Sequence, residues 1–349
     1  MDLSMVWQDF GLDRLQEGMG TLFPQQSLSL EQLLGKVATG DILGALGELF
    51  SGSLAGIQAQ FSGMKNILVW LLILGILSSL MNHFVEIFDK HQVADISFYF
   101  MYLLFSAVLL GSFSQAAQVA EETMENVILF VKLLVPAYLI SVGVAAGSVT
   151  AGASYQMMLL VIYGVEQILV SAMLPLIYSF VMLSMINGIW AEEKLNLLIE
   201  LLEKAVGWIL KAAIGIVTGI SIFQALITPL VDSAKSSALQ KVLASLPGVG
   251  NLADGVVELV LGSAMVLKNS IGVVLLLLLL AMCAAPLVKI AVIALILKCA
   301  AAFMEIVSDK TACANRAGDG GLMLLRTAGT AMLLFLIAIS ACTASVRRL

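Results

Sequence analysis

The sequence predicts an all-α polytopic membrane protein with about seven to nine transmembrane or re-entrant helices, accompanied by amphipathic interfacial helices. Composition supports this fold class, because 60% of the 349 residues are hydrophobic and only 12% are charged, too few to cover a soluble surface. The apolar runs are also long enough for helices of about 20 residues that cross a bilayer. The formal charge of −6, without a basic stripe, excludes nucleic acid as a partner.

Residues 1–64 are predicted to form a helical N-terminal region, extracytoplasmic or interfacial, and residues 65–349 the polytopic membrane domain. The first region has no run long enough to span and lacks the pattern of a signal peptide. Ser29 to Gln32 has the spacing of a capping box, and Asp41 is predicted to cap the next short helix. The apolar sides of these helices leave three roles open: packing on the membrane domain, lying in the lipid interface, or docking a partner.

Three apolar runs in the first half of the membrane domain have the length of a span, and they cover residues 66–85, 96–117 and 127–144. Glu121, Glu122 and Glu125 predict an acidic turn between the second and third runs. The next run, 155–189, is interrupted by Glu166 and Pro175. It is long for one helix and short for two, so a kinked span and a helix followed by a half-helix both stay open.

Residues 191–211 predict an amphipathic helix at the membrane surface, with Glu200 and Lys204 in the favourable i,i+4 order. The chain is then expected to turn into a span that ends near residue 230. Residues 231–310 are predicted to cross or enter the membrane two or three times, with breaks at Lys268-Asn269 and at Pro286. A polar loop at 308–321 and a last span at 322–342 complete the predicted membrane domain.

Small residues and prolines mark expected packing sites and helix breaks. Gly143 with Gly147, and Gly215 with Gly219, have the GxxxG spacing that lets helices approach closely. The prolines at positions expected to break or kink helices are Pro136, Pro175, Pro247 and Pro286. Their equal spacing in the two halves predicts a weak internal repeat, an arrangement known from transporters, although chance accounts for such a spacing equally well.

Charges inside apolar runs are candidates for function, because a charge in hydrocarbon needs a partner or water. The residues of this kind are Lys132, Glu166, Asp254, Glu258, Lys268, Lys289, Lys298 and Arg326. Lysines near span ends can snorkel to the interface. Lys132, Glu166 and Lys268 are the candidates for a polar interior, and Glu166 is expected either to line it or to pair with a lysine such as Lys132.

No catalytic, cofactor or metal site is predicted. The chain has two histidines, His83 and His91, too few for a histidine-based metal site or triad. The four cysteines match no zinc or CxxC spacing, and are interpreted as small apolar side chains. We therefore expect that the protein is not an enzyme.

Positive charges predict the orientation of the chain. Arg347, Arg348, Lys235, Lys241 and Lys90 are all cytoplasmic if the N-terminal region and the acidic turn lie outside. This predicts a multipass cell-membrane protein with an extracytoplasmic N-terminus and a cytoplasmic C-terminus.

Five motifs within about eighty residues resemble those of the stage III sporulation protein AE family. They are VDSAK (231–235), LPGVGN (246–251), VLKNSIGV (266–273), APLVKI (285–290) and IVSDK (306–310). The upstream segments LVP (134–136), GSVTAGA (147–153) and PLI (175–177) fit the same family, so that the likeness covers roughly residues 66–346.

The resemblance implies a structural membrane subunit, with a pore-forming role left open, of a secretion-like channel complex between mother cell and forespore that endospore development requires. It implies that the subunit lies in the mother-cell membrane around the forespore. The implied partners are other membrane proteins of the same operon, a secretion-type ATPase that acts indirectly, and a forespore-side channel partner. A homo-oligomer is left open. The alternative is a self-contained secondary transporter with a midplane site near Glu166.

Overall fold

The computed structural model describes the backbone of residues 30–47, 91–146, 149–189, 194–243, 250–307 and 312–344, and of positions 16, 17, 49, 69, 73 and 76. Side chains are described within 31–47, 96–133, 157–188, 194–226, 270–302 and 315–340, with a few short gaps. The part described in this way is helical with short turns and holds no strand, so the all-α prediction is confirmed.

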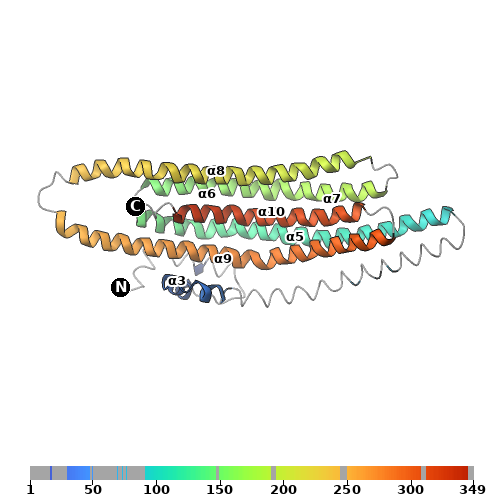
Figure 1. Cartoon of the computed structure of the whole chain (residues 1–349), viewed down its shortest axis with the longest axis horizontal. Helices are drawn as coiled ribbons and strands as arrows, with labels where there is room; N and C mark the ends of the chain where they lie inside the picture. Colours follow the sequence, from blue (N-terminus) through green and yellow to red (C-terminus); the bar gives the residue numbers. More distant parts are fainter. Residues whose placement is uncertain are drawn as a thin grey trace.

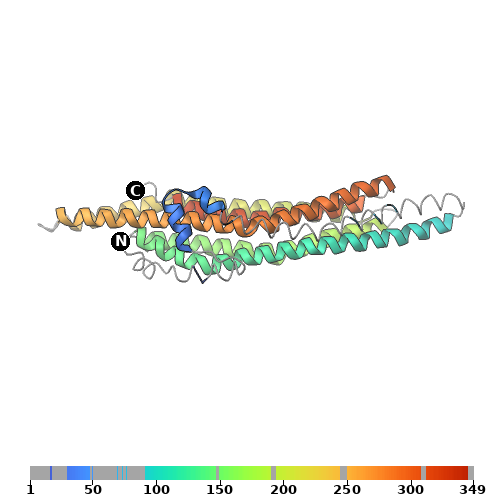
Figure 2. The same ribbon diagram turned by 90° about the horizontal axis from the view of Figure 1, so that it is seen from below.

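Long helices lie side by side along a common axis and alternate in direction (Figure 1). They are α5 (His91–Ala146), α6 (Val149–Ile168), the π-helix η1 (Leu169–Met173), α7 (Leu174–Ile189), α8 (Asn196–Leu243), α9 (Gly250–Val307) and α10 (Ala312–Ala344). Helix α10 lies in the middle and contacts α5, α7, α8 and α9. Figure 2 shows α5 in one layer of the bundle and α9 with α10 in the other.

These helices are much longer than a bilayer is thick. Helix α5 has 56 residues and α9 has 58, which correspond to about 85 Å at 1.5 Å per residue, against a hydrocarbon core of about 30 Å. Within the described residues, five helical segments are long and apolar enough to cross a membrane. They are Tyr102–Leu133, Leu160–Gly188, Asn196–Gln224, Ser270–Ala302 and Asn315–Ser340. The predicted count of seven to nine is not confirmed, and the predicted span at 66–85 lies almost entirely outside the described residues.

The predicted acidic turn at Glu121, Glu122 and Glu125 is wrong, because α5 is helical from His91 to Ala146. All three carboxylates are exposed, whereas Ala120 just before them and Met124 among them are 0% exposed. The helix therefore continues through this segment with a charged face outside and an apolar face in the core. No turn at Glu121 to Glu125 is therefore present to mark the outer side of the membrane.

The predicted breaks at Lys268-Asn269 and Pro286 are also absent, since α9 continues through both. A proline removes one backbone donor, and neighbouring helices or local adjustments can offset that loss within a membrane helix. The predicted loop at 308–321 is wrong from residue 312 on, where α10 begins. Its polar residues are accommodated in the helix because Asp319 forms an ion pair of 2.6 Å with Lys298 of α9.

The predicted turn after residues 191–211 is wrong, because α8 runs without interruption from Asn196 to Leu243. The predicted pair within it is confirmed: the Lys204 ammonium lies 2.7 Å from Glu200 Oε1. The run 155–189 forms one continuous helical rod in which η1 separates α6 from α7, with Pro175 just after η1. A π-helix widens the backbone where the proline would otherwise clash with the preceding turn.

The described N-terminal helix packs on the bundle. Helix α3 (Leu30–Ala38) contacts α9, and its Leu33 is 1% exposed. Gly40 follows with a φ of 87°, a left-handed conformation suited to the end of a helix. The predicted cap is confirmed, because the Gly44 N–H donates to Asp41 Oδ1 over 3.0 Å.

Candidate functional site around Glu166

Glu166 is the one acidic or basic side chain that is fully buried among the described residues, with 0% of its surface exposed. Neither of its carboxyl oxygens has a hydrogen-bond partner in the part of the chain that the structure describes. Burying a polar group without a hydrogen-bond partner lowers the stability of a protein by about 1 kcal/mol to several kcal/mol. The fold holds this group in place despite that cost, so Glu166 is the strongest candidate for a functional residue.

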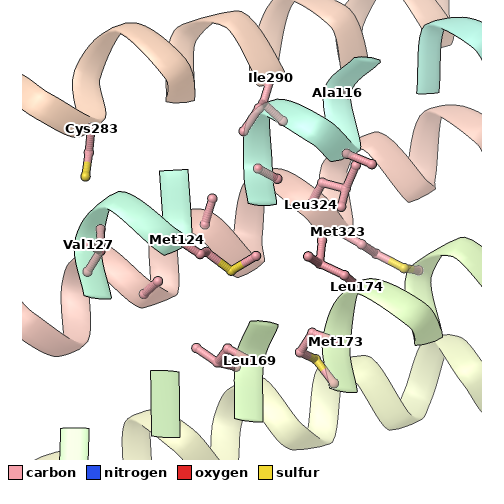
Figure 3. Close-up of a cluster of buried hydrophobic side chains, with 14 of the residues drawn as sticks. Ala116, Met124, Val127, Leu169, Met173, Leu174, Cys283, Ile290, Met323 and Leu324 are labelled. Carbon is pink, nitrogen blue, oxygen red and sulfur yellow. The ribbon is translucent and has the colours of Figure 1, made fainter. Parts of the chain in front are cut away.

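The π-helix lies directly beside this carboxyl. Leu169 and Met173, one and two turns after Glu166 on the same side of the rod, are 0% exposed. Figure 3 shows them in an apolar cluster with Met124 and Val127 of α5. Cys283 of α9 belongs to the same cluster and lies near enough to Glu166 for a Coulombic interaction. Leu169 and Met173, which share a side of the rod with Glu166, thus pack among apolar side chains and a thiol, and π-helices are frequent at functional sites.

Lys132, the predicted partner, does not reach this carboxyl. It is exposed on α5, and its ammonium lies 5.3 Å from the centroid of the Tyr163 ring on α6, a cation–π contact. Tyr163 precedes Glu166 by less than one helical turn. Lys132 therefore lies near the height of Glu166, but its ammonium contacts the Tyr163 ring and not the carboxyl. Lys268 lies in α9, and its side chain is outside the described residues.

The predicted small-residue and proline sites have mixed positions. A Cβ added at Gly215 or Gly219 would meet nothing within 4 Å, so neither marks a close approach within the described bundle. Pro136 and Gly143 lie inside α5, Pro175 is the second residue of α7, and Pro286 lies inside α9. Gly147 and Pro247 fall outside the described residues, so the internal repeat stays a prediction.

The close helix approach occurs instead at Gly320 and Gly321 of α10, which sequence reasoning assigned to a loop. A Cβ on Gly320 would lie 2.3 Å from Val181 Cγ2, and one on Gly321 would lie 3.1 Å from the Cα atom of Ala294. Both glycines are buried. The signal was the GDGG sequence (318–321), whose small residues favour helix contact as well as loops.

A polar network at one end of the bundle was also missed. The Asn187 side chain donates to Asn196 Oδ1 over 2.9 Å and accepts from the Leu195 N–H over 2.9 Å. The Arg316 guanidinium donates to the same Asn196 oxygen over 2.8 Å. These bonds tie α7, α8 and α10 together, so we interpret the network as structural.

Within the described residues, no group of three or more His, Cys, Asp and Glu side chains could hold a metal ion. Cys283 and Cys299 are free thiols, the first buried and the second exposed. The arrangement around Glu166 thus offers a single buried carboxyl with a nearby thiol. That arrangement can hold or release a proton, and it lacks the placed acid–base pair that hydrolytic chemistry needs.

Comparison with known proteins agrees with this architecture. The chain is 22% identical over 219 residues to stage III sporulation protein AE of Bacillus subtilis (strain 168). That match covers 62% of this chain and 55% of the relative, so it spans about half of the relative's length. No solved structure matches the chain. The profile of the family described as Stage III sporulation protein AE (spore_III_AE) matches residues 28–346. With nearly its whole length matched, the chain belongs to the stage III sporulation protein AE family, and has a role in sporulation.

Proposed function

We propose that the chain is a structural membrane subunit of a secretion-like channel complex between mother cell and forespore. Membership of the sporulation family and five helical segments suited to membrane crossing support this proposal. The proposed location is the mother-cell membrane around the forespore. The proposed partners are other membrane proteins of the same operon, a secretion-type ATPase that acts indirectly, and a channel partner on the forespore side.

The observation that carries this proposal is the closed interior of the bundle. Large apolar side chains with under 2% exposure fill it, among them Phe113, Phe130 and Phe180. The Phe113 and Tyr178 rings pack edge to face at 5.3 Å, and those of Phe130 and Phe335 at 5.4 Å. Among the described residues, a core packed in this way leaves no polar path along the axis of the bundle. A conduit would therefore form between this chain and its neighbours, as expected for a subunit.

The proposed orientation keeps the C-terminus in the cytoplasm. Helices α8 and α10 end at the same end of the bundle (Figure 1), and the last turns of α8 carry Lys235 and Lys241. Basic residues favour the cytoplasmic side. This end of the bundle is therefore the proposed cytoplasmic end.

An affinity pull-down from sporulating cells tests the subunit role. Tagged full-length chain, extracted in mild detergent, is expected to bring down several other membrane proteins of its operon in a particle much larger than one chain. Mass spectrometry identifies the companions, and native sizing measures the particle. A particle that holds this chain alone would contradict the proposal.

The alternative, a self-contained secondary transporter, is favoured by one observation, the buried Glu166 beside a π-helix. Purified chain in sealed vesicles separates the two functions. The subunit proposal predicts no solute uptake above that of empty vesicles, whether or not a proton gradient is applied. Uptake by wild-type chain that is lost in Glu166→Gln would establish the transporter instead.

A further inference from the structure

Two exposed charged surfaces lie on different helices of the bundle. The first, the acidic face of α5, consists of Gln118, Glu121, Glu122 and Glu125, all exposed, with the Gln118 amide donating to Glu122 Oε1 over 3.1 Å. The second, the α10 stripe, consists of the exposed residues Asn315, Arg326, Leu333 and Ser340. No ion pair between described residues joins Arg326 to these carboxylates.

Contacts between α5 and α10 show that the two surfaces share one height along the bundle. Phe113 of α5 packs near Gly320 of α10, and Phe130 packs on Phe335, so the two helices run in the same direction. Glu121 precedes Phe130, and Arg326 precedes Phe335, by the same nine residues. At equal rise per residue, Glu121 and Arg326 therefore lie level with each other.

The same spacing shows that the two side chains point in opposite directions. Nine residues are about two and a half helical turns, so each charge lies on the side of its helix opposite the phenylalanine. Since Phe130 and Phe335 face each other, Glu121 points away from α10 and Arg326 points away from α5. One chain thus presents opposite charges at one height on opposite sides.

The two surfaces carry complementary charge. The acidic face has three exposed carboxylates, whereas the α10 stripe has the exposed guanidinium of Arg326 and no acidic residue. Charges of opposite sign on two protein surfaces favour their contact and fix its register. A protein surface with this charge pattern could therefore bind both.

We propose that this surface is a second copy of the chain, with the acidic face of α5 in one copy against the α10 stripe of the next. Copies related by rotation about an axis parallel to the bundle keep equal heights, so Glu121 and Arg326 of neighbours meet level. Because the two surfaces differ, the contact is heterologous and leads to a ring when the rotation closes. This inference rests on the proposed subunit function and adds that the chain assembles with itself.

Charge reversal tests the contact with full-length chains. Variant A carries Glu121→Lys and Glu122→Lys, variant B carries Arg326→Glu, and each is made with two different tags and co-expressed in pairs. Wild type is expected to capture wild type. Capture of A by A and of B by B is expected to fall about tenfold or more, because like charges then face each other. Capture of A by B is expected to return to the wild-type level, because both contacts are complementary again.

Glu203→Lys reverses an exposed carboxylate on α8 and is expected to leave self-capture unchanged. Restoration in the mixed pair rules out misfolding as the cause of the losses. The inference is overturned if wild type captures no second copy, if A or B captures itself as well as wild type does, or if the mixed pair stays as weak as the single variants. If the chain captures only operon companions, the self-assembly inference is overturned and the proposed subunit function stands. If the chain captures only itself, the proposed subunit function is overturned and self-assembly stands.

Discussion

A Glu166→Leu variant is expected to unfold at a higher temperature than wild type and yet fail to support sporulation. Leucine fills the apolar site and removes two carboxyl oxygens that lack hydrogen-bond partners among the described residues. Replacing such a group by an apolar one stabilises a protein by about 1 to 3 kcal/mol. Because Glu166 lowers the stability of the fold, we expect its carboxyl to serve function instead. Counts of heat-resistant spores should therefore fall to those of a strain lacking the chain. Thermal unfolding in detergent and heat-resistant spore counts measure the two effects.

Two matched variants separate burial from charge at this site. Glu166→Gln keeps the shape and polarity of the side chain and is expected to preserve stability, so any loss of spores reports the missing ionisable group. Glu203→Leu changes an exposed glutamate on α8 and should alter neither quantity. Wild-type sporulation by the Glu166→Leu strain would remove any functional role for this carboxyl.

A Gly321→Leu variant is expected to separate α9 from α10 and to lower stability severely. The Cβ atom alone would lie 3.0 Å from Ala294 Cβ and 3.1 Å from its Cα, which is backbone and cannot turn aside. Overpacking of this kind costs about 1 to 3 kcal/mol for a few methylenes, and more where helices must move apart. The measurement is the thermal unfolding of purified chain, together with its yield from membranes.

Gly329→Leu provides the control on the same helix, because a Cβ there would meet nothing within 4 Å. Leucine forms helix better than glycine by about 0.5 to 1 kcal/mol, so this variant should be as stable as wild type or slightly more so. Equal losses at both positions would show that the contact at Gly321 is not the cause.

The helical membrane class could be predicted, because composition and the length of apolar runs indicate it whatever the tertiary contacts are. The ends of the helices could not be predicted in this way. Glu121, Glu122 and Glu125 suggested a turn, yet they share one side of a helix whose other side is buried. Pro286 suggested a break, yet α9 continues through it. The glycines at 318–321 suggested a loop, yet side chains of neighbouring helices pack on them. For the acidic segment and the glycines, tertiary contact overrode a local signal, and a single sequence does not display that contact.

The candidate site was predictable in part. A charge in the middle of an apolar run is costly wherever the run lies, so Glu166 could be selected from sequence. Its neighbours could not, because Cys283 lies on α9, more than one hundred residues away in the chain. Lys132 was expected to pair with Glu166, but its ammonium lies over the ring of Tyr163, three residues before Glu166, instead.

The network at the junction of α7 and α8 bears on how the chain is built during synthesis. Asn187 bonds to Leu195 and Asn196 across only eight and nine positions, so this hairpin can close once its two helices have left the ribosome. Arg316, 120 positions later, then finds an acceptor already held in place. The central helix α10 is thus the last described helix to be synthesised, and it packs against α5, α7, α8 and α9, which are all made before it.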